Sequence, residues 1–406
     1  MAELAQFDLV IVGAGIAGCA LAAALSGNGL KIALVEAQPL AVLDLPRERN
    51  LASYDPRVSA ITPRSQSHLA SMGVWNKISD YRLCSYQHMT VWDAEGTGRI
   101  DFDRNEVEAP CLGHIIENRA IVNSLLQYVT SAADVKIFPQ AIVQDCKSLM
   151  SESMMSVELA DGTALRAQLL VAADGARSQI RTFMGFATRE WEYGHSAIVA
   201  TVQVEHSHRE TCWQRFLTSG PLAFLPLPGS EEQHYCSIVW SVKNELAEPL
   251  MQLSDAAFAK ELEQSIESCL GKVLGCSRRF NFPLRQRHAR NYVRPGVALV
   301  ADAAHTIHPL AGQGVNLGLQ DVAVLAEELL AGYARGLNLG DLRLLQRYQR
   351  RRKGENLMMM AAMDGFKSLF EQESLSIRWL RNTGLRAVGQ LGPVKQQLIR
   401  HAMGLA

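Results

Sequence analysis

The chain has 406 residues, of which 48% are hydrophobic and 20% are charged, and its formal net charge is -1. This length suits two or three domains, and the composition is typical of an ordinary globular protein. The near-zero charge excludes a global basic field of the kind that binds nucleic acid. The eight cysteines are scattered and form no C-x-x-C pair. We therefore expect reduced thiols in a cytoplasmic protein, with neither a disulfide framework nor a metal site.

An uncharged, apolar stretch covers residues 9–25. It is shorter than the roughly 20 residues that a membrane-spanning helix needs, and glycines interrupt it. The preceding residues include Glu3 and Asp8 and lack the basic segment of a signal peptide. We therefore expect no membrane span.

The first half of the chain begins with a predicted strand at 9–12, a helix that ends at Leu25 and a second strand at 32–35. An irregular loop rich in Pro, Asp, Arg and Asn follows at 38–56. Beyond this loop we expect a helix at 65–72, a hairpin of strands 89–92 and 99–102, and a helix at 118–129.

The second half predicts a strand at 169–173 and then three extended segments at 197–204, 222–227 and 235–242. A buried strand at 297–301, a helix at 316–330 and a helical remainder from 342 complete the chain. Buried strands alternating with helices at both ends predict an α/β fold. We expect a Rossmann-like domain with an inserted β-sheet domain and a C-terminal helical region. The boundaries are 1–75, 104–182 and 285–341 for the Rossmann-like domain, 76–103 and 183–284 for the sheet domain, and 342–406 for the helical region.

A G-x-G-x-x-G pattern lies between the first strand and the first helix, with glycines at 13, 15 and 18 and Ala17 before the last of them. Gly13 permits a tight turn, Gly15 lets the backbone approach a pyrophosphate, and Gly18 allows close packing of helix on strand. Glu36 ends the second strand, where an acid can bind ribose hydroxyls. The alternative is a glycine-rich structural turn. The pattern predicts dinucleotide binding without separating FAD from NAD.

A second signature starts where the strand at 297–301 ends in Asp302. An acid at that point can bind a polyol such as the ribityl chain of a flavin. The glycine-rich loop that follows exposes backbone N–H groups at a helix N-terminus, which suits the electron-rich edge of a reduced flavin. The residues that we assign to this loop are Pro309, Gly312, Gln313, Gly314, Val315 and Asn316.

Together these signatures resemble those of the flavoprotein aromatic hydroxylases, the group that contains para-hydroxybenzoate hydroxylase. A third segment, 171–178, resembles the Asp-Gly motif of that group through Asp174 and Gly175, and Arg57 matches an arginine near its flavin. Asn118 and Arg119 are further candidates for cofactor binding. Two alternatives stay open: Asp174 can cap the following helix, and Arg57 can form a surface ion pair.

A closer resemblance is to the ubiquinone-biosynthesis hydroxylases, carried by segments 220–227, 305–314 and 397–405. The chain looks nearest to the member that acts on a 2-polyprenylphenol at ring carbon 5. One departure is Ala301 before Asp302, where the family has glycine. We expect the extra methyl group to crowd the cofactor and weaken FAD retention.

The resemblance implies FAD as cofactor, NADPH or NADH as electron donor, and hydroxylation of a polyprenylated phenol by dioxygen through a flavin hydroperoxide. The candidate catalytic residues are His305, His308 and Pro309. The histidines would tune protonation at the flavin, or else hydrogen-bond the loop backbone. The candidate substrate-pocket residues are Leu222, Phe224, Leu225 and Pro226, for which plain sheet core is the alternative.

The helical region after 342 is rich in basic residues and has apolar faces. Such helices can lie on an anionic membrane surface or pack on the core with a solvated basic rim, and the sequence leaves both open. It also leaves open two other functions: a flavin reductase without oxygen insertion, and a non-catalytic FAD-binding subunit of a quinone-synthesis complex.

Overall fold

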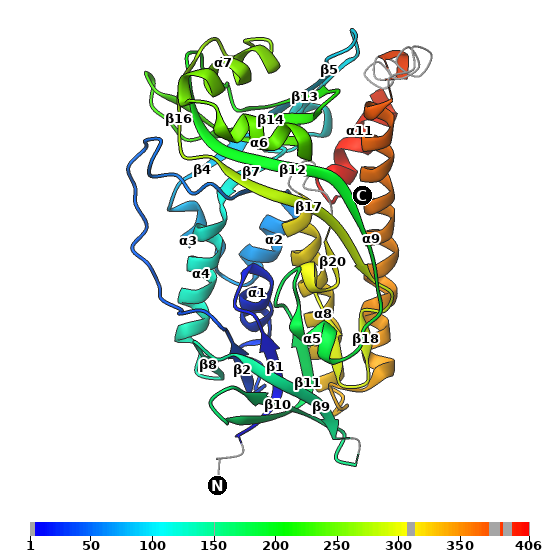
Figure 1. The fold of residues 1–406 in the computed structure, drawn as a ribbon. Helices are drawn as coiled ribbons and strands as arrows, with labels where there is room; N and C mark the ends of the chain where they lie inside the picture. The colour runs from blue at the N-terminus through cyan, green and yellow to red at the C-terminus, as the bar shows by residue number, and fades with distance from the viewer. Residues whose placement is uncertain (1–4, 150, 307–312, 373–381, 385–391, 406) are drawn as a thin grey trace.

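The computed structural model describes residues 5–149, 151–306, 313–372, 382–384 and 392–405. A mostly parallel sheet lies in one lobe and a mostly antiparallel sheet in the other, and the long helix α9 (Leu342–Glu371) runs beside both (Figure 1). The fold is therefore α/β with a helical C-terminal region, as the sequence predicts.

The first sheet has the order β18-β19-β11-β1-β2-β8, and the antiparallel hairpin β9–β10 extends β11. Strands β1, β2, β8, β11 and β19 are mutually parallel. Their apolar runs are buried because helices cover parallel sheets on both faces. The strands are β1 (Ala5–Val12), β2 (Ile32–Val35), β8 (Val135–Phe138), β9 (Val143–Leu149), β10 (Met154–Leu159), β11 (Ala164–Ala172), β18 (Val293–Arg294) and β19 (Val297–Leu299).

The helices around this sheet form one core with it. Helix α1 is apolar along nearly its whole length and is buried almost completely, as expected of a helix enclosed by other elements. The helices of this lobe are α1 (Ile16–Leu25), α2 (Pro63–Ser71), α3 (Trp75–Ser79), α4 (Asn118–Ser131), α5 (Gln179–Phe183) and α8 (Gln313–Tyr333).

The second sheet has the order β20-β17-β12-β15-β14-β13-β5-β6, with β16 against β12. Helices α6 (Asn244–Gln252) and α7 (Asp255–Ser265) lie on its outer side (Figure 1). The strands are β5 (His88–Asp93), β6 (Arg99–Asp103), β12 (Thr188–Val204), β13 (Thr211–Leu217), β14 (Gly220–Leu227), β15 (His234–Lys243), β16 (Val273–Cys276), β17 (Phe280–Ala289) and β20 (His305–Thr306).

A third, small antiparallel sheet has the order β3 (Val58–Ile61), β7 (Gly113–Glu117) and β4 (Leu83–Tyr86). Two short 3-10 turns, η1 (Arg104–Val107) and η2 (Ala301–Ala303), and the helix α11 (Gly392–Ala402) complete the described elements. The strand that the sequence predicts at 297–301 ends at Leu299, and its last predicted residue, Ala301, begins η2.

The predicted hairpin at 89–102 is confirmed as β5–β6, and the three extended segments are confirmed as β12, β14 and β15. Helices α6 and α7, the hairpin β9–β10 and strand β17 were not predicted. Strand β17 alternates apolar and other residues only in its first half, contains Pro283 and continues with four polar residues at 285–288, so its strand signal in sequence is weak. Helix α6 is short and contains Pro249, which argues against a helix in sequence.

Candidate flavin site

The predicted signatures meet at one edge of the parallel sheet. Val12 is in register with Val35 and with Ala172, and Ala172 is in register with Leu299. The strand ends are joined by hydrogen bonds from Gly13 N to Val35 O at 2.7 Å and from Val300 N to Ala172 O at 3.1 Å. The segments that follow these strands therefore lie together at the carboxyl edge, where open α/β sheets bind their ligands.

The glycine turn leaves no room for side chains at two of its three positions. Gly13 has φ +103°, and a Cβ there would lie 2.4 Å from Ala173 O. A Cβ at Gly18 would lie 1.8 Å from Gly13 O, whereas a Cβ at Gly15 would meet no atom within 4 Å. Helix α1 begins at Ile16 with no side-chain cap. Its free N–H groups and the space beside Gly15 form a cradle suited to a pyrophosphate.

Glu36 lies directly beside this turn. Its Oε2 accepts a hydrogen bond from Ala14 N at 2.8 Å, and its Oε1 accepts one from Gln38 N at 2.8 Å. The carboxylate is half-buried, and each oxygen has a second lone pair. Glu36 therefore holds the turn in place and still has acceptor capacity for ribose hydroxyls. Ala17 is half-buried in the first turn of α1.

Asp174 follows β11 and caps α5. Its Oδ2 accepts hydrogen bonds from Gln179 N at 2.8 Å and Ile180 N at 3.2 Å, so the helix-capping alternative describes one of its oxygens. The other, Oδ1, is buried without a partner among the described residues. Burial raises the pKa of this carboxyl, and Ser178 and the helix N–H groups oppose the rise. Gly175 has φ +78° and open space at its Cβ position.

Asp302 lies within η2 and is exposed to solvent. Desolvation by the surrounding protein raises the pKa of its carboxyl, and His305 and Arg57 oppose that rise. Arg57 is exposed and comes from the turn before β3. The structure thus brings together an arginine and an acid that are far apart in the chain.

Ala301, the residue that departs from the family pattern, has φ +52°. A Cβ at Gly318 of α8 would lie 2.8 Å from the Ala301 Cβ. The methyl group therefore faces α8 at a glycine. This differs from the expectation that the methyl group crowds the cofactor.

His305 is not exposed at this edge. Its Nε2 lies 2.5 Å from Asp321 Oδ2, and the two side chains are 2% and 0% exposed. Asp321 also pairs with Arg352 of α9, from Arg352 Nε to Oδ1 at 2.9 Å. The sequence offered two roles for His305, tuning of the flavin or a hydrogen bond to the loop backbone. The bond to the Asp321 side chain corresponds to neither. Sequence reasoning did not find Asp321 or Arg352.

The groups at this edge of the sheet can be compared with those that FAD binding requires. A cradle without Cβ atoms, an acid with an unused buried oxygen at Asp174, and an accessible acid at Asp302 are the groups that a pyrophosphate and a polyol chain require. Glu36 adds acceptors for a ribose. The residues present therefore fit an FAD molecule.

The comparisons with known proteins agree with this site. A family model described as FAD binding domain matches residues 6–362. The chain is 35% identical to the 3-demethoxyubiquinol 3-hydroxylase of Escherichia coli, over 98% of each chain. It is 33% identical to the mitochondrial ubiquinone biosynthesis monooxygenase COQ6 of Homo sapiens, over 98% of this chain and 92% of that one. The chain belongs to this family of FAD-dependent monooxygenases.

Solved structures of other monooxygenases share the fold. PqsL of Pseudomonas aeruginosa, in complex with 2-aminobenzoylacetate, has a TM-score of 0.77 and 22% identity over 94% of this chain and 100% of that chain. The p-nitrophenol 4-monooxygenase PnpA of Pseudomonas putida has a TM-score of 0.76 and 17% identity over 98% and 99%. At these identities the likeness concerns the fold.

Two predicted cofactor residues bond other parts of the flavoprotein. Asn316 is 0% exposed; its Nδ2 donates to Ala60 O at 2.7 Å and its Oδ1 accepts from Thr62 N at 3.0 Å. Asn118 Oδ1 accepts from Ser59 Oγ at 2.6 Å. These asparagines fasten α8 and α4 to strand β3 and the turn after it, beside Arg57.

Arg119 belongs to a buried ionic cluster that the sequence analysis missed. Its Nη2 donates to Glu117 Oε2 at 2.6 Å, and Arg82 Nε donates to Glu117 Oε1 at 2.8 Å. Both arginines also donate to Ser53 O in the loop at 38–56. Glu117 accepts a further bond from Asp55 N at 2.7 Å. The cluster therefore anchors the irregular loop, including the turn that carries Arg57.

Of the predicted flavin loop, His308, Pro309 and Gly312 lie outside the described residues. Gln313, Gly314 and Val315 form the first turn of α8. A Cβ at Gly314 would meet no atom within 4 Å, so this helix start has open space beside it.

The predicted substrate residues lie on both faces of β14. Leu222 and Phe224 are 0% exposed and pack with Trp240 and Phe258 beneath α6 and α7, and Pro226, of the same parity, is also buried. The sheet-core alternative therefore describes Leu222 and Phe224. Leu225 lies on the opposite face and packs against the cluster that contains Tyr54.

The face of the second sheet turned away from α6 and α7 carries a separate apolar group. Ala197, Val199 and Leu284 are buried together, with Tyr193 and Val239 packed against them. They come from β12, β15 and β17. Sequence reasoning missed them because β12 is apolar on both faces, so its sequence gives no period-two signal for which side chains point inward.

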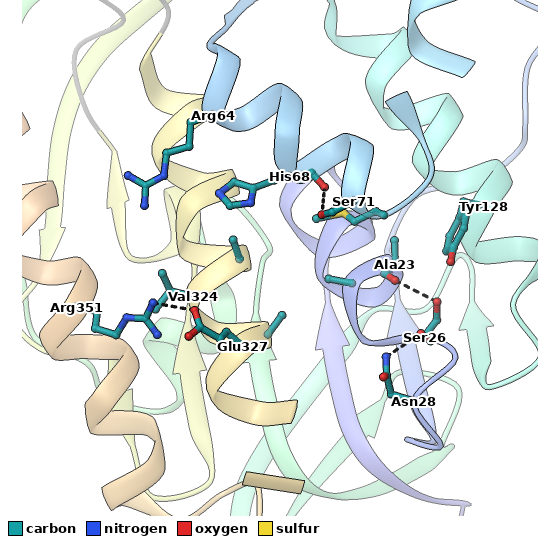
Figure 2. Close-up of a pocket in the computed structure, with 14 residues that line it drawn as sticks. Ala23, Ser26, Asn28, Arg64, His68, Ser71, Tyr128, Val324, Glu327 and Arg351 are labelled. Carbon is teal, nitrogen blue, oxygen red and sulfur yellow. Dashed lines mark hydrogen bonds and ion pairs between the residues drawn. The ribbon is translucent and has the colours of Figure 1, made fainter. Parts of the chain in front are cut away.

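A polar groove of about 450 Å³ lies elsewhere on the flavoprotein. Figure 2 shows Arg64 and His68 projecting from α2, with Arg351 of α9 paired to Glu327 of α8. Ala23 and Ser26, at the C-terminal end of α1, line it. Because the glycine turn is at the other end of α1, this groove is not the cofactor site.

No helix in the part of the chain that the structure describes has the length and hydropathy needed to span a bilayer.

Proposed function

We propose that this flavoprotein hydroxylates the ring of a polyprenylated phenol in ubiquinone biosynthesis, with dioxygen as oxidant and NADPH or NADH as electron donor. The observation that carries the proposal is the meeting of the glycine turn, Glu36, Asp174 and Asp302 at one sheet edge. The ubiquinone hydroxylases to which the chain is similar supply the substrate class. Ring carbon 5 stays a prediction of the sequence resemblance.

Bound FAD would supply the redox chemistry that activates dioxygen. The chain's own residues bind and orient it: the Gly13–Gly18 turn and the α1 N-terminus hold the pyrophosphate, Glu36 the ribose, and Asp302 the ribityl chain. Arg57 would place positive charge beside the flavin. We assign Asn118, Arg119 and Asn316 to the support of this region instead of to direct cofactor contact.

The substrate ring would lie against the inner face of the second sheet, on the group of Ala197, Val199 and Leu284. Small and aliphatic side chains leave room for an aromatic ring and exclude water from the reacting atoms. Leu225, on the same side of the sheet as the Tyr54 cluster, is the predicted substrate residue that we retain.

We also propose a division into a Rossmann-like domain, an inserted sheet domain and a C-terminal helical region. The hairpin β5–β6 supports it, because β5 pairs in parallel with β13 of the second sheet although it lies within the N-terminal part of the chain. A peripheral membrane contact of the C-terminal helices belongs to the proposal as well. Exposed Leu357 and Met358 on α9 are the apolar side chains that such a contact would use.

The test supplies the FAD-loaded protein with a short-chain prenylphenol, NADPH or NADH, and isotopically labelled dioxygen, and analyses the product by mass spectrometry. One labelled oxygen on the ring is the expected result, and the product structure gives the ring carbon. Asp302→Asn should weaken FAD binding and lower product formation at limiting FAD together, whereas Glu327→Gln, in the groove of Figure 2, should leave both unchanged. Coenzyme oxidation without oxygen on any substrate would favour a reductase, and no bound flavin would favour a non-catalytic subunit.

A further inference from the structure

One carboxylate oxygen holds both ends of the turn that carries Asp302. Asp321 Oδ2 accepts a hydrogen bond from Ala301 N at 3.1 Å, and the same atom lies 2.5 Å from His305 Nε2. Since a carboxylate can only accept, the imidazole donates. Asp302 is one residue from the first of these bonds and three from the second, so its position depends on both.

The other oxygen of Asp321 is fixed from helix α9. Its Oδ1 accepts from Arg352 Nε at 2.9 Å and from Asn356 Nδ2 at 3.1 Å. All three residues are 0% exposed. Burial acts to raise the pKa of Asp321, but His305 and Arg352 together hold it below its usual value. The acceptor therefore stays charged at neutral pH, and its charge is compensated.

The turn itself needs external support. Ala301 has φ +52°, a region that residues other than glycine enter only at an energetic cost. Within the turn, Thr306 Oγ1 donates to Asp302 O at 3.3 Å, a long bond that adds little restraint. Ala304 N donates to Ala301 O at 2.8 Å, and from outside the turn Ala289 N donates to Ala304 O at 2.8 Å and Arg181 Nη1 to Ala303 O at 2.9 Å. The contacts to Ala301 N and to the His305 side chain come from Asp321 of α8, and α9 acts on the turn only by holding Asp321.

We propose that Asp321 is a positioning residue for the cofactor: by holding Ala301 N and His305 Nε2 on one oxygen, it orients Asp302 toward the ribityl chain. This inference rests on the proposed function for the presence of FAD. The alternative is that the Asp321–Arg352 pair only joins α8 to α9. The two differ because only the positioning role predicts that loss of the His305 bond alone changes how flavin is held.

The experiment compares Asp321→Asn, His305→Ala and His305→Gln with Glu328→Gln in the full-length protein. Glu328 also lies on α8 and pairs with α9, through Arg351 Nη1 at 2.9 Å, so it is a matched control for the helix contact. His305→Ala keeps the Asp321–Arg352 pair, so it tests the role even where Asp321→Asn fails to fold. The measurements are the FAD dissociation constant, the visible circular dichroism of the bound flavin, and thermal unfolding without FAD.

We expect Asp321→Asn and His305→Ala to weaken FAD binding about tenfold or more, because the displaced turn misplaces Asp302. The flavin dichroism should change as well. His305→Gln should recover part of both, since its amide can donate to Asp321 Oδ2. Glu328→Gln should leave affinity and dichroism as in the wild type.

Unchanged FAD affinity and dichroism in His305→Ala, with only a lower unfolding temperature, would overturn the positioning role and leave the proposed function intact. The positioning role is equally overturned if Glu328→Gln weakens FAD as much as Asp321→Asn does, because any α8–α9 contact would then have the effect. A wild-type protein that binds no FAD would instead overturn the proposed function and this role together.

Discussion

The two ends of the flavin site are built in different ways. The Gly13–Gly18 turn is held by backbone contacts with the neighbouring strands and by the nearby Glu36 carboxylate, and two of its three glycines are required by lack of space. The Ala301–His305 turn has backbone contacts as well, but both of its ends also bond Asp321 of α8, which Arg352 of α9 holds in place. One end therefore needs glycines at fixed spacing, and the other needs a buried charge network.

This difference decides what substitutions do. At the glycine turn, damage comes from atoms added where backbone already lies. At the second turn, damage comes from atoms removed, because a charge left without its partner in the interior is costly. Substitutions at the two turns therefore test the contrast, and the largest effect is expected in the buried charge network.

Arg352→Met should be the most damaging change. The variant removes the guanidinium that compensates the charge of Asp321 and leaves this buried carboxylate bonded only by His305, Asn356 and Ala301 N. We expect a loss of about 3–5 kcal/mol in the free energy of unfolding. Arg351→Gln, at the neighbouring position, removes pairs of an exposed arginine with exposed Glu327 and half-buried Glu328 and should cost about 1 kcal/mol or less. Urea denaturation of both variants measures the difference.

The same variant has a defined pH dependence. The pKa of Asp321 is lowered in the folded protein, so its stabilising contribution is present above the unfolded pKa of about 4 and is lost as pH falls through the folded value. The stability gap between wild type and Arg352→Met should therefore be largest at neutral pH and shrink below about pH 4. A gap that stays constant into acid would mean that Arg352 acts by packing and not by charge.

Gly18→Ala tests the opposite mechanism at the glycine turn. Its Cβ would lie 1.8 Å from Gly13 O, so the backbone must move, at an expected cost of about 1–3 kcal/mol in the apoprotein. Gly15→Ala meets no atom within 4 Å, and it should leave the apoprotein unchanged while weakening FAD. Unfolding without FAD and FAD titration separate the two; equal behaviour of the two variants would contradict the cradle.

The same difference between the two turns explains which parts of the flavin site could be predicted from the sequence. The glycine turn, Glu36 and the register of β1 and β2 follow from local spacing, so the first end of the site was predictable. The partners of His305 were not, because Asp321 lies 16 residues after His305 and Arg352 a further 31 residues after Asp321. In sequence, each is an ordinary charged residue on an amphipathic helix.

The strands of the second sheet could be predicted from the sequence, but the face to which each side chain points could not. The alternation in β14 separates Leu222 and Phe224 from Leu225, yet both sets are apolar, and the side covered by helices is known only once α6 and α7 are placed. The same limit applied to β12. A substrate wall could therefore be assigned to the sheet from the sequence, while the residues on its inner face required the structure.

Asp302→Asn should separate stability from cofactor binding. The pKa of Asp302 is raised in the folded protein, so its charged form is disfavoured there, and folding gains stability as pH falls through that pKa. Above that pKa, the amide should leave the apoprotein as stable as the wild type or more so. The loss of a charged acceptor should weaken FAD by about 1.5 kcal/mol. Loss of apoprotein stability at neutral pH would show that the acid serves the fold itself.

The smallest expected effect concerns the residue that departs from the family pattern. Ala301→Gly relieves a left-handed conformation, worth about 1–2 kcal/mol, but gives the unfolded chain about 0.5–1 kcal/mol more conformational entropy, so a net gain below about 1 kcal/mol is expected. Gly318→Ala alone should destabilise, because its Cβ would lie 2.8 Å from that of Ala301. In the double variant the clash is gone, and alanine is the better helix former.

The double-mutant cycle therefore predicts a coupling between positions 301 and 318, in which Gly318→Ala changes from destabilising to neutral or stabilising once Ala301 is glycine. Thermal unfolding of the four apoproteins measures it. Additive effects would mean that the methyl group of Ala301 does not depend on the glycine in α8. In that case the methyl group would be free to face the cofactor, and Ala301→Gly should then tighten FAD binding, which the packing against α8 does not predict.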